Sequence, residues 1–290
     1  MNDLDMCRQE FAERLREPVG VRSDPLVHAF ATVPRERFLG PGPWNVCIVD
    51  SDGLSGYRLT ENSNAEQTYR DVVIAIDPAR GLHNGQPSCL AMWIERLDLK
   101  AGGAVLQVGC GTGYYTAILA EVVGPAGRVV AFEVDESLAD RAKTNLAHYP
   151  QVEVISAPVS DLTRDSTDAI LVNCGVTQPP LSWLLALRMG GRMVVSITAS
   201  SDGTGTGEGA MFLFAREGAG IAIQYISAAA FFPCVGARDE AMNRALLDKT
   251  EKDWLAPRSV RTDLHAEDSS CWLHSSRCCL SRLPLTAGAA

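Results

Sequence analysis

The chain has 290 residues, 46% of them hydrophobic, and its 26 basic and 35 acidic side chains give a net charge of −9 at pH 7. A chain of this length can bury a full core without disulfides or metals. The acidic balance argues against a nucleic-acid partner, because such partners are bound largely through clustered Lys and Arg. No apolar run is long enough to span a membrane, so we expect a cytoplasmic protein without a membrane partner.

Residues 1–80 are predicted to form a helical and lid segment. A first helix should place four apolar residues on one face: Leu4, Cys7, Phe11 and Leu15. Pro18 is expected to end this helix. A second helix should begin with Asp24 as its N-cap and Pro25 at the first helical position, and should end before Pro34.

Residues 81–232 are predicted to form the cofactor-binding domain, an α/β fold with a Rossmann-like, mostly parallel sheet. Apolar runs of strand length alternate there with helical segments. The expected strands are residues 104–108, 128–133, 152–156, 169–172 and 192–197. After a loop at residues 200–209, residues 211–215 and 221–227 should form an antiparallel hairpin at the sheet edge.

Residues 233–290 are predicted to be a C-terminal extension that is partly disordered, with poor order from about Ser259. The extension contains the only cysteine cluster of the sequence: Cys271, Cys278 and Cys279 with His274. This spacing lacks the paired ligands at both ends that a zinc site usually has. We therefore favour reduced thiols in a loosely ordered tail and predict no metal.

The most informative stretch is VLQVGCGTGYYTAILAEVVGPAGRVVAFEVD, residues 105–135. An apolar strand leads into the glycines Gly109, Gly111 and Gly113, and a second strand ends in Glu133, 20 residues after the last glycine. The glycines let a ligand approach the backbone, and the acid can accept hydrogen bonds from a ribose. The third glycine comes one residue earlier than in dinucleotide sites, which indicates a nucleoside without a pyrophosphate.

This stretch resembles motif I of class I S-adenosylmethionine-dependent methyltransferases. The resemblance implies S-adenosyl-L-methionine as the cofactor. It also implies contacts from the loop, the acid, their neighbours and the end of the fourth strand: Val108, Gly109, Gly111, Gly113, Tyr114, Glu133, Val134 and Asn173. A loop-capping role for Asn173 is an equal alternative. Asn173 is followed by Cys-Gly-Val and not by the proline-proline-aromatic set of nucleobase amino-methyltransferases, which argues against that chemistry.

Three further segments resemble the protein-L-isoaspartate O-methyltransferase family: HAFATVPRERFLGP at 28–41, TYRDVVIAID at 68–77 and HNGQPS at 83–88. The resemblance implies methyl transfer to a carboxylate oxygen. Two segments depart from the family. Its Thr-Ile-Ser is His83, Asn84 and Gly85 here, which removes a hydroxyl near the reacting methyl group. Its Gly-Asp-Gly after the third strand is Ala-Pro-Val at 157–159, which removes a carboxylate for the adenine amino group, and Asp161 is a distant replacement.

These departures favour a methyl transfer to a carboxylate or hydroxyl of a small molecule or modified peptide. One alternative is the family's own activity, protein-L-isoaspartate O-methylation. A second is a non-catalytic adaptor that binds the cofactor. A third is a nicotinamide-dependent oxidoreductase, against which the short glycine spacing counts.

His83 is the candidate catalytic residue. A carboxylate acceptor is already ionised and needs no base, whereas a hydroxyl needs a group that accepts its proton. The alternative is a histidine that caps the helix near Pro87 or orients the substrate. Asn84 and Gln86 are predicted to bind a substrate carboxylate or carbonyl, and their alternative is a polar loop that hydrogen-bonds to itself.

Aromatic residues before the cofactor domain are candidates for a lid over the substrate, and Tyr57 is the predicted substrate contact among them. Trp44 and Tyr69 share this segment. The alternative for all three is packing between the helical segment and the sheet, which is the commoner role of buried aromatic residues. Arg70 and Asp71 are expected to be surface or capping residues.

Overall fold

The computed structural model describes residues 3–50, 53–159, 162–201, 205–218, 220–275 and 278–285. The chain forms two compact units that alternate along the sequence. Unit 1 comprises Met1–Glu95, Leu99–Gly102 and Cys110–Ser156, and unit 2 comprises Arg96–Asp98, Gly103–Gly109 and Ala157–Ala290. The division into residues 1–80, 81–232 and 233–290 stays a prediction, and Asp161 lies outside the described residues.

Unit 1 begins with helices, as predicted: α1 (Asp3–Arg14), α2 (Arg16–Val19), α3 (Asp24–Thr32) and α4 (Glu36–Leu39). Pro18 lies inside the short α2. The N-cap of α3 is Ser23, whose hydroxyl accepts a hydrogen bond from the Leu26 N–H, so the cap lies one residue before the predicted Asp24. The helix ends before Pro34, as expected.

Two short ribbons follow the helices. The first consists of strands β1 (Asn45–Asp50) and β2 (Gly53–Leu59), which pair antiparallel. The short helix η1 (Ala65–Thr68) follows. The second ribbon consists of strands β3 (Ala75–Asp77) and β4 (Leu82–His83), which also pair antiparallel and flank η2 (Pro78–Arg80). A small core of Leu39, Trp44 and Ile74 supports them. Helix α5 (Pro87–Arg96) comes next. The segment predicted to be helical and lid-forming therefore contains strands as well as helices.

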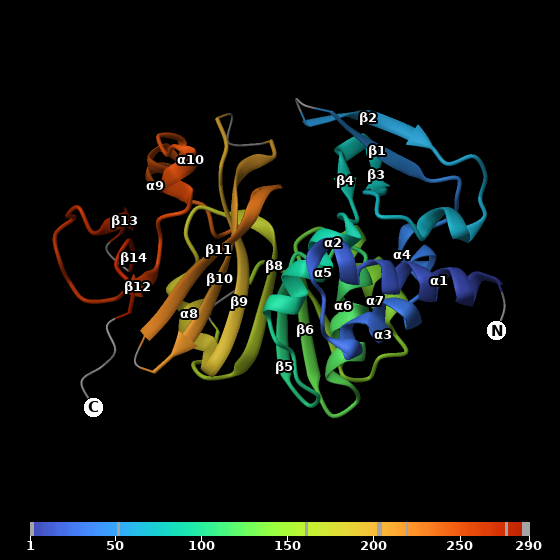
Figure 1. Cartoon of the computed structure of the whole chain (residues 1–290), viewed down its shortest axis with the longest axis horizontal. Coiled ribbons are helices and arrows are strands. Elements are labelled where there is room, and N and C mark those ends of the chain that lie inside the picture. The colour runs from blue at the N-terminus through green and yellow to red at the C-terminus, as the bar shows by residue number, and fades with distance from the viewer. Residues whose placement is uncertain are drawn as a thin grey trace. The chain divides into compact units, whose positions relative to one another are not determined.

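The remainder of unit 1 alternates helix and strand: α6 (Tyr114–Val123), β6 (Arg128–Glu133), α7 (Glu136–Leu146) and β7 (Val152–Ser156). Both strands have the predicted bounds and pair in parallel, with Glu133 opposite Ser156. Helix α6 packs on β6, and α7 packs on β6 and β7 (Figure 1). This arrangement places the carboxyl end of β6 directly before the N-terminus of α7.

Unit 2 contains a mixed sheet. Strands β5 (Ala104–Val108), β8 (Thr167–Val176) and β9 (Leu187–Ala199) pair in parallel, and α8 (Leu181–Ala186) connects β8 with β9. Strands β10 (Gly207–Glu217) and β11 (Gly220–Phe231) continue the sheet in antiparallel order. The predicted parallel strands and the antiparallel hairpin are confirmed, and four of these strands are longer than predicted.

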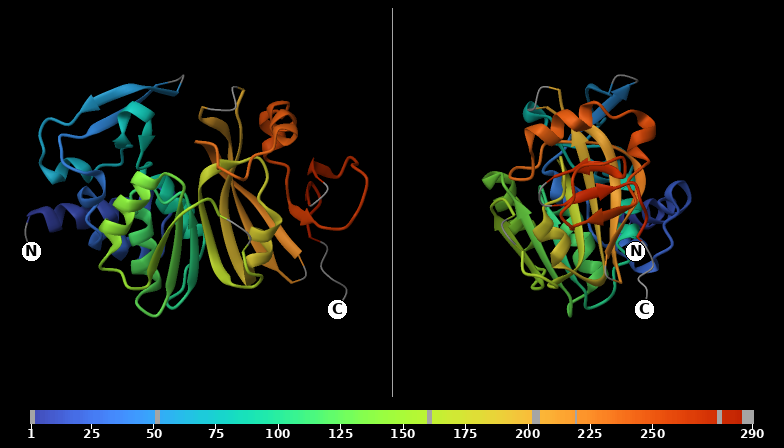
Figure 2. Two further views of the ribbon diagram at one scale, coloured as in Figure 1. Left: turned by 180° about the vertical axis from the view of Figure 1, so that it is seen from behind. Right: turned by 90° about the vertical axis from the view of Figure 1, so that its left-hand side faces the viewer.

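The described residues of the C-terminal part of unit 2 form helices and strands. After α9 (Glu240–Leu247) and α10 (Glu251–Trp254), strands β12 (Ser259–Arg261), β13 (Cys271–His274) and β14 (Cys279–Ser281) extend the sheet in the order β11-β12-β14-β13 (Figure 2). The prediction of poor order from about Ser259 is wrong for these strands. Trp272 is buried, and its ring centroid lies 6.1 Å from that of Phe212 and 5.6 Å from that of Trp254. Strands of three or four residues are too short to show periodicity, so the sequence does not reveal them.

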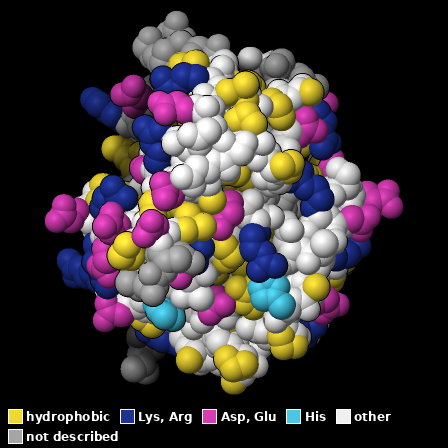
Figure 3. All heavy atoms as spheres, turned by 90° about the vertical axis from the view of Figure 1, so that its right-hand side faces the viewer, with side chains coloured by type: hydrophobic (Ala, Val, Ile, Leu, Met, Phe, Trp, Pro, Cys, Tyr) yellow, Lys and Arg dark blue, Asp and Glu magenta, His cyan; other side chains and the backbone are white. Residues whose placement is uncertain are grey.

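None of the described helices is long and apolar enough to cross a membrane. On the face of the molecule drawn in Figure 3, basic and acidic side chains are interspersed. No extended basic surface is visible among the side chains coloured in that view.

Candidate functional site

The glycine loop between β5 and α6 has left-handed backbone at each glycine. In unit 1, φ is +56° at Gly111 and +94° at Gly113, values that side chains with a Cβ rarely adopt. A Cβ on Gly113 would also lie 2.7 Å from the Leu146 Cδ1 atom of α7. Gly113 therefore permits close packing of α7, whereas at Gly111 the turn itself requires glycine.

Glu133 lies at the end of β6 and is only 7% exposed. Its Oε2 accepts a 2.7 Å hydrogen bond from the Gly111 N–H, and its Oε1 accepts a 3.1 Å bond from the Asp135 N–H. Each carboxylate oxygen keeps a further lone pair that can accept a hydrogen bond from a hydroxyl group. The next side chain, Val134, is 47% exposed and provides apolar surface beside the acid. Two of the predicted cofactor contacts, Glu133 and Val134, therefore lie side by side in unit 1.

Two buried polar atoms near the loop have no hydrogen-bond partner in the structure. One is the Thr112 Oγ1 atom in unit 1, and the other is the Asn173 Oδ1 atom in unit 2. In unit 2, a Cβ on Gly109 would lie 3.3 Å from the Asn173 carbonyl oxygen, so β5 and β8 approach closely where β5 ends at Val108. Buried polar atoms normally have partners, so both atoms are suited to a polar ligand. Each atom, in its own unit, could accept a hydrogen bond from a hydroxyl or amino group of a ligand, and the cofactor contact of Asn173 stays a prediction.

Tyr114, a predicted cofactor contact, is the first residue of α6 and is fully buried. Its ring packs on Phe38 and Phe30, with centroids 5.6 and 6.3 Å away. The side chain therefore belongs to the core between α6 and the N-terminal helices. The Tyr114 hydroxyl is buried there without a hydrogen-bond partner in the structure, and its contact with the cofactor stays a prediction.

An ion-pair cluster that the sequence did not suggest lies next to Glu133. The Arg80 Nε lies 2.6 Å from an Asp77 carboxylate oxygen, and Arg80 also pairs with Asp135. Asp135 caps α7 by accepting a 2.9 Å bond from the Leu138 N–H. The Arg80 guanidinium and this backbone N–H lower the pKa of Asp135 to about 2. Through the ion pairs of Arg80, the cluster connects the turn after β3 with the residues that follow β6.

His83 lies on β4 opposite Ala75 of β3, and its side chain is exposed. Nearby protein atoms partly desolvate the imidazole, which disfavours its charged form and lowers the pKa of His83 below the ordinary value of 6.5. His83 is therefore neutral at pH 7 and can accept a proton or a hydrogen bond. Its assignment as a general base stays a prediction.

The two predicted amide contacts of the substrate are both bonded to other protein groups. The Asn84 Oδ1 accepts a 3.4 Å bond from the Arg35 Nε, and the Gln86 Nε2 donates a 2.9 Å bond to Asp71. In this structure the loop follows the alternative prediction, in which its polar side chains hold the protein itself together. Their binding of a substrate stays a prediction.

Arg35 organises this region, and sequence reasoning missed it although it lies in the VPRERF segment. Its side chain is fully buried and donates to four backbone carbonyls: Thr68 at 2.9 Å, Arg70 at 3.0 Å, Val72 at 2.8 Å and Gly85 at 3.4 Å. One guanidinium thereby joins residues 68–72 to the His83 loop. An arginine before a glutamate reads as a surface residue in a single sequence, so no signal marked its burial.

Gly85, at the position of the serine in the family pattern, has a backbone conformation that suits glycine. Its φ is +75°, and a Cβ there would lie 3.0 Å from the Leu90 Cδ2. A serine would strain both the backbone and the packing of α5. The departure from the family therefore involves the loop conformation as well as the lost hydroxyl.

The predictions for the aromatic and capping residues have different outcomes. Asp71 caps α5 through the Ser88 N–H at 2.8 Å and the Ser88 hydroxyl at 2.7 Å, which confirms its capping role. Trp44 is buried in the core beside β1 and β3, and Tyr69 is buried against Phe11, so packing explains both. Tyr57 differs, because its buried hydroxyl has no partner in the structure. Its role as a lid residue that contacts the substrate stays a prediction.

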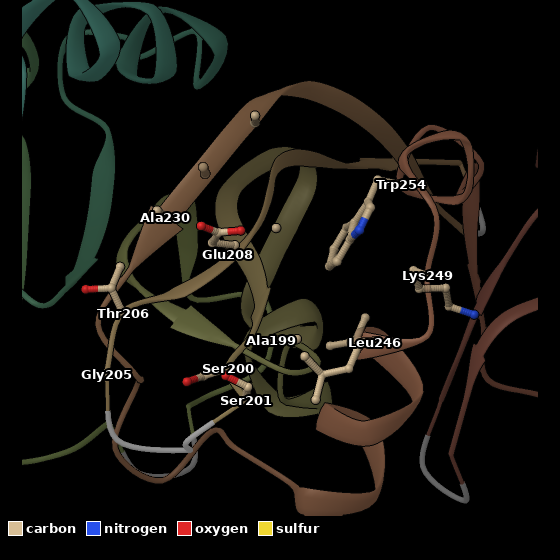
Figure 4. Close-up of a pocket in the computed structure, with 14 residues that line it drawn as sticks. Ala199, Ser200, Ser201, Gly205, Thr206, Glu208, Ala230, Leu246, Lys249 and Trp254 are labelled. Atoms are coloured by element: carbon tan, nitrogen blue, oxygen red, sulfur yellow. The ribbon is translucent and has the colours of Figure 1, made fainter. Parts of the chain in front are cut away.

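Unit 2 also has an open hollow at the carboxyl end of β9 (Figure 4). Its wall includes the carboxylate of Glu208 and the indole of Trp254. The carboxyl edge of parallel strands is where α/β proteins usually bind ligands. No residue of this hollow was predicted, because glycines, serines and alanines carry most of its lining.

The parallel α/β core, the glycine loop and the buried acid at the end of β6 define a class I S-adenosylmethionine-dependent methyltransferase. A sequence model of the family described as "Protein-L-isoaspartate(D-aspartate) O-methyltransferase (PCMT)" matches residues 57–239. The chain belongs to this family, and its cofactor is S-adenosyl-L-methionine. The predicted fold, family, enzyme class and cofactor are confirmed, and the oxidoreductase alternative is wrong.

Named relatives and structures agree. The protein-L-isoaspartate O-methyltransferase of Methanopyrus kandleri is 31% identical over 196 residues, which cover 66% of this chain and 76% of the relative. One from Archaeoglobus fulgidus is 31% identical over 219 residues, covering 74% and 86%. A solved protein-L-isoaspartate O-methyltransferase has a TM-score of 0.64 at 26% identity, covering 82% of this chain and 69% of that one. A Plasmodium falciparum structure in complex with S-adenosyl-L-homocysteine has a TM-score of 0.57 and covers 78% of this chain and 97% of that one. At 17% identity it supports the fold alone.

Proposed function

We propose that this methyltransferase transfers a methyl group to the free carboxylate of an isoaspartyl or D-aspartyl residue in a peptide or protein. The observation that carries the proposal is the family match over residues 57–239, which includes the glycine loop, Glu133 and the His83 loop. This is the family's own activity, which was an alternative prediction from the sequence. The loss of the serine at Gly85 had favoured other acceptors.

The chemistry suits the groups present. When bound, S-adenosylmethionine supplies a methyl group on a positively charged sulfur. A carboxylate oxygen forms the new bond to carbon, the carbon–sulfur electron pair returns to sulfur, and no proton has to be removed. Catalysis then depends mainly on positioning the acceptor in line with the methyl group.

Within this mechanism, three residues of unit 1 have defined tasks. Glu133, fixed by the Gly111 N–H, accepts hydrogen bonds from the ribose. The neutral imidazole of His83 binds and orients the acceptor and need not take a proton. Arg35 holds the His83 loop through its bonds to Asn84 and the Gly85 carbonyl.

A hydroxyl acceptor is the second candidate. It is favoured by the lowered pKa of His83, which keeps the imidazole available as a proton acceptor at neutral pH. In that case the His83 Nδ1 or Nε2 atom receives the hydroxyl proton as the oxygen bonds to the methyl carbon. The product would be an ether and not an ester.

The test uses purified full-length protein, S-adenosylmethionine with an isotopically labelled methyl group, and matched peptides that contain isoaspartate, D-aspartate or L-aspartate at one position. We expect label on the isoaspartyl or D-aspartyl peptide that mild base releases as methanol, because methyl esters hydrolyse and ethers do not. The L-aspartyl peptide is the matched control. Base-stable label on a hydroxyl acceptor, with none on the carboxylate peptides, would contradict the proposal.

A further inference from the structure

The C-terminal strands of unit 2 bring together four side chains with metal-binding atoms. Cys271 and His274 lie on β13, Cys279 lies on β14, and His265 lies in the segment before β13. One nitrogen or sulfur atom of each residue lies within 4.8 Å of those of the other three. The cluster predicted from the sequence differs from this set, since it contained Cys278 and lacked His265.

Two sulfur–nitrogen distances in the set are close to those between ligands of one tetrahedral zinc ion. Zinc–sulfur bonds of about 2.3 Å and zinc–nitrogen bonds of about 2.0–2.1 Å give tetrahedral sulfur–nitrogen edges of about 3.5 Å. The Cys271 Sγ lies 3.5 Å from the His265 Nε2 and 3.8 Å from the His274 Nδ1. Cys271 and Cys279 are both free thiols, so no disulfide occupies the cluster.

The groups behind the cluster orient one imidazole for a metal. The His265 Nδ1 lies 2.8 Å from the Asp263 carbonyl oxygen and 3.3 Å from the Asp263 carboxylate. Its hydrogen therefore belongs on Nδ1, which leaves the lone pair of Nε2 directed toward the Cys271 sulfur. Metal-binding histidines usually donate their second nitrogen to a carboxylate or carbonyl in this way. Arg261 in turn binds both oxygens of the Asp263 carboxylate, at 3.2 and 2.9 Å.

The surroundings of the sulfur atoms also suit thiolate ligands. Cys271 and Cys279 are 9% and 1% exposed. The Asp268 N–H lies 3.4 Å from the Cys271 Sγ and can donate to a thiolate, although the Asp268 carboxylate lies 3.6 Å from the same atom. Two thiolates neutralise a divalent ion, so the completed site carries no net charge of its own. Four protein ligands leave no open coordination position, which is the pattern of a structural site.

We propose that His265, Cys271, His274 and Cys279 bind one zinc ion that fixes the C-terminal strands of unit 2. The mixed sulfur and imidazole set at tetrahedral spacing favours zinc over magnesium or calcium, which prefer oxygen ligands. The ion joins the segment before β13 to β13 and β14. This role replaces the prediction of reduced thiols in a loosely ordered tail, and it is independent of the methyl acceptor.

The first experiment measures metal content by mass spectrometry on full-length protein purified under reducing conditions. We expect about one zinc ion per chain, and near zero in the double variant Cys271→Ser, Cys279→Ser. Cys278→Ser is the matched control, because Cys278 is a buried thiol beside Cys279 outside the four-residue set. Wild-type protein that takes up no zinc from excess, or a double variant that binds as well as the wild type, overturns the proposal.

A second measurement covers the case in which the double variant does not fold. Wild-type protein is stripped of metal with a chelator and then loaded with Co²⁺. Tetrahedral cobalt bound by thiolates gives intense visible bands and a near-ultraviolet charge-transfer band, and we expect both. Weak bands of octahedral cobalt, or an intact mass two hydrogens lower that maps to a Cys271–Cys279 disulfide, would instead overturn the site.

Discussion

The backbone N–H of Gly111 donates a 2.7 Å hydrogen bond to the buried carboxylate of Glu133. Gly111 of the glycine loop and the acid that is predicted to bind the ribose are therefore joined within unit 1 by the protein itself. The Asp135 N–H holds the other carboxylate oxygen, so the acid is oriented by two backbone groups from its two sides.

Glu133→Gln should weaken cofactor binding. The substitution keeps the shape but removes the charge, and hydrogen bonds to charged groups contribute about 1.5–3 kcal/mol, so affinity should fall about 10- to 100-fold. Isothermal calorimetry with S-adenosylmethionine measures the change. Asp140→Asn on the exposed side of α7 is the control, and equal affinities of the two variants would contradict the ribose assignment.

His83→Ala should lower turnover while cofactor affinity stays near that of the wild type. If His83 accepts a proton, the loss should be at least about 100-fold, whereas a purely orienting role predicts a smaller loss. The pKa of His83 is lowered, so the wild-type rate should stay constant at neutral pH and fall only on the acid side, where the ring becomes charged. His28→Ala, at an exposed histidine of α3, is the control. If the fall in rate at acid pH persists unchanged in His83→Ala, it comes from the titration of another group.

Arg35→Lys should destabilise the fold despite the conserved charge. A lysine ammonium cannot reach the four carbonyls that the guanidinium binds, and each unsatisfied buried carbonyl costs about 1–3 kcal/mol. The free energy of unfolding in urea should fall by about 3 kcal/mol or more. Arg37→Lys on the exposed side of α4 should change it by less than about 0.5 kcal/mol. An unchanged free energy of unfolding in Arg35→Lys would show that these hydrogen bonds are dispensable for stability.

Asp135→Asn should make stability less dependent on acidity. The pKa of Asp135 is held at about 2, below its ordinary 3.8, so its contribution is full above about pH 4 and is lost as the pH falls toward about 2. Asparagine still caps α7, so the change isolates the pairing with Arg80. Urea unfolding at several pH values should show a shallower loss for the variant. Parallel curves for both proteins would assign the acid sensitivity elsewhere.

Trp272→Ala should show that the C-terminal strands belong to the folded core. Removing a fully buried tryptophan costs about 3–5 kcal/mol. Urea unfolding measures the total loss, and hydrogen exchange of β12–β14 shows whether these strands open separately. Leu264→Ala is the control, since Leu264 is 96% exposed. A change as small as that of Leu264→Ala would support the disordered tail predicted from the sequence.

The parts of the fold that the sequence predicted well are those with strong local patterns. The strands 104–108, 128–133 and 152–156 have the predicted bounds because each apolar run is bounded by glycines, turns or acids. The G-x-G-x-G spacing and Glu133 likewise identify the cofactor loop, since both depend on residues close in sequence.

The parts that were missed depend on contacts distant in sequence. Arg35 is defined by carbonyls more than thirty residues away, and the pairing of Arg80 with Asp135 spans 55 residues. His265 and Cys279 meet only because β13 and β14 pair. Single-sequence patterns carry no such information, and they likewise do not show that the Tyr114 ring is buried in the core.

The packing of Trp272 on Phe212 also bears on how members of this family can be recombined. Phe212 lies within the family match, which ends at residue 239, while Trp272 lies beyond it. A chimera that joins this enzyme to a relative at residue 239 would leave one aromatic partner without the other. Exchanges should therefore carry β10 and residues 240–285 together as a single block.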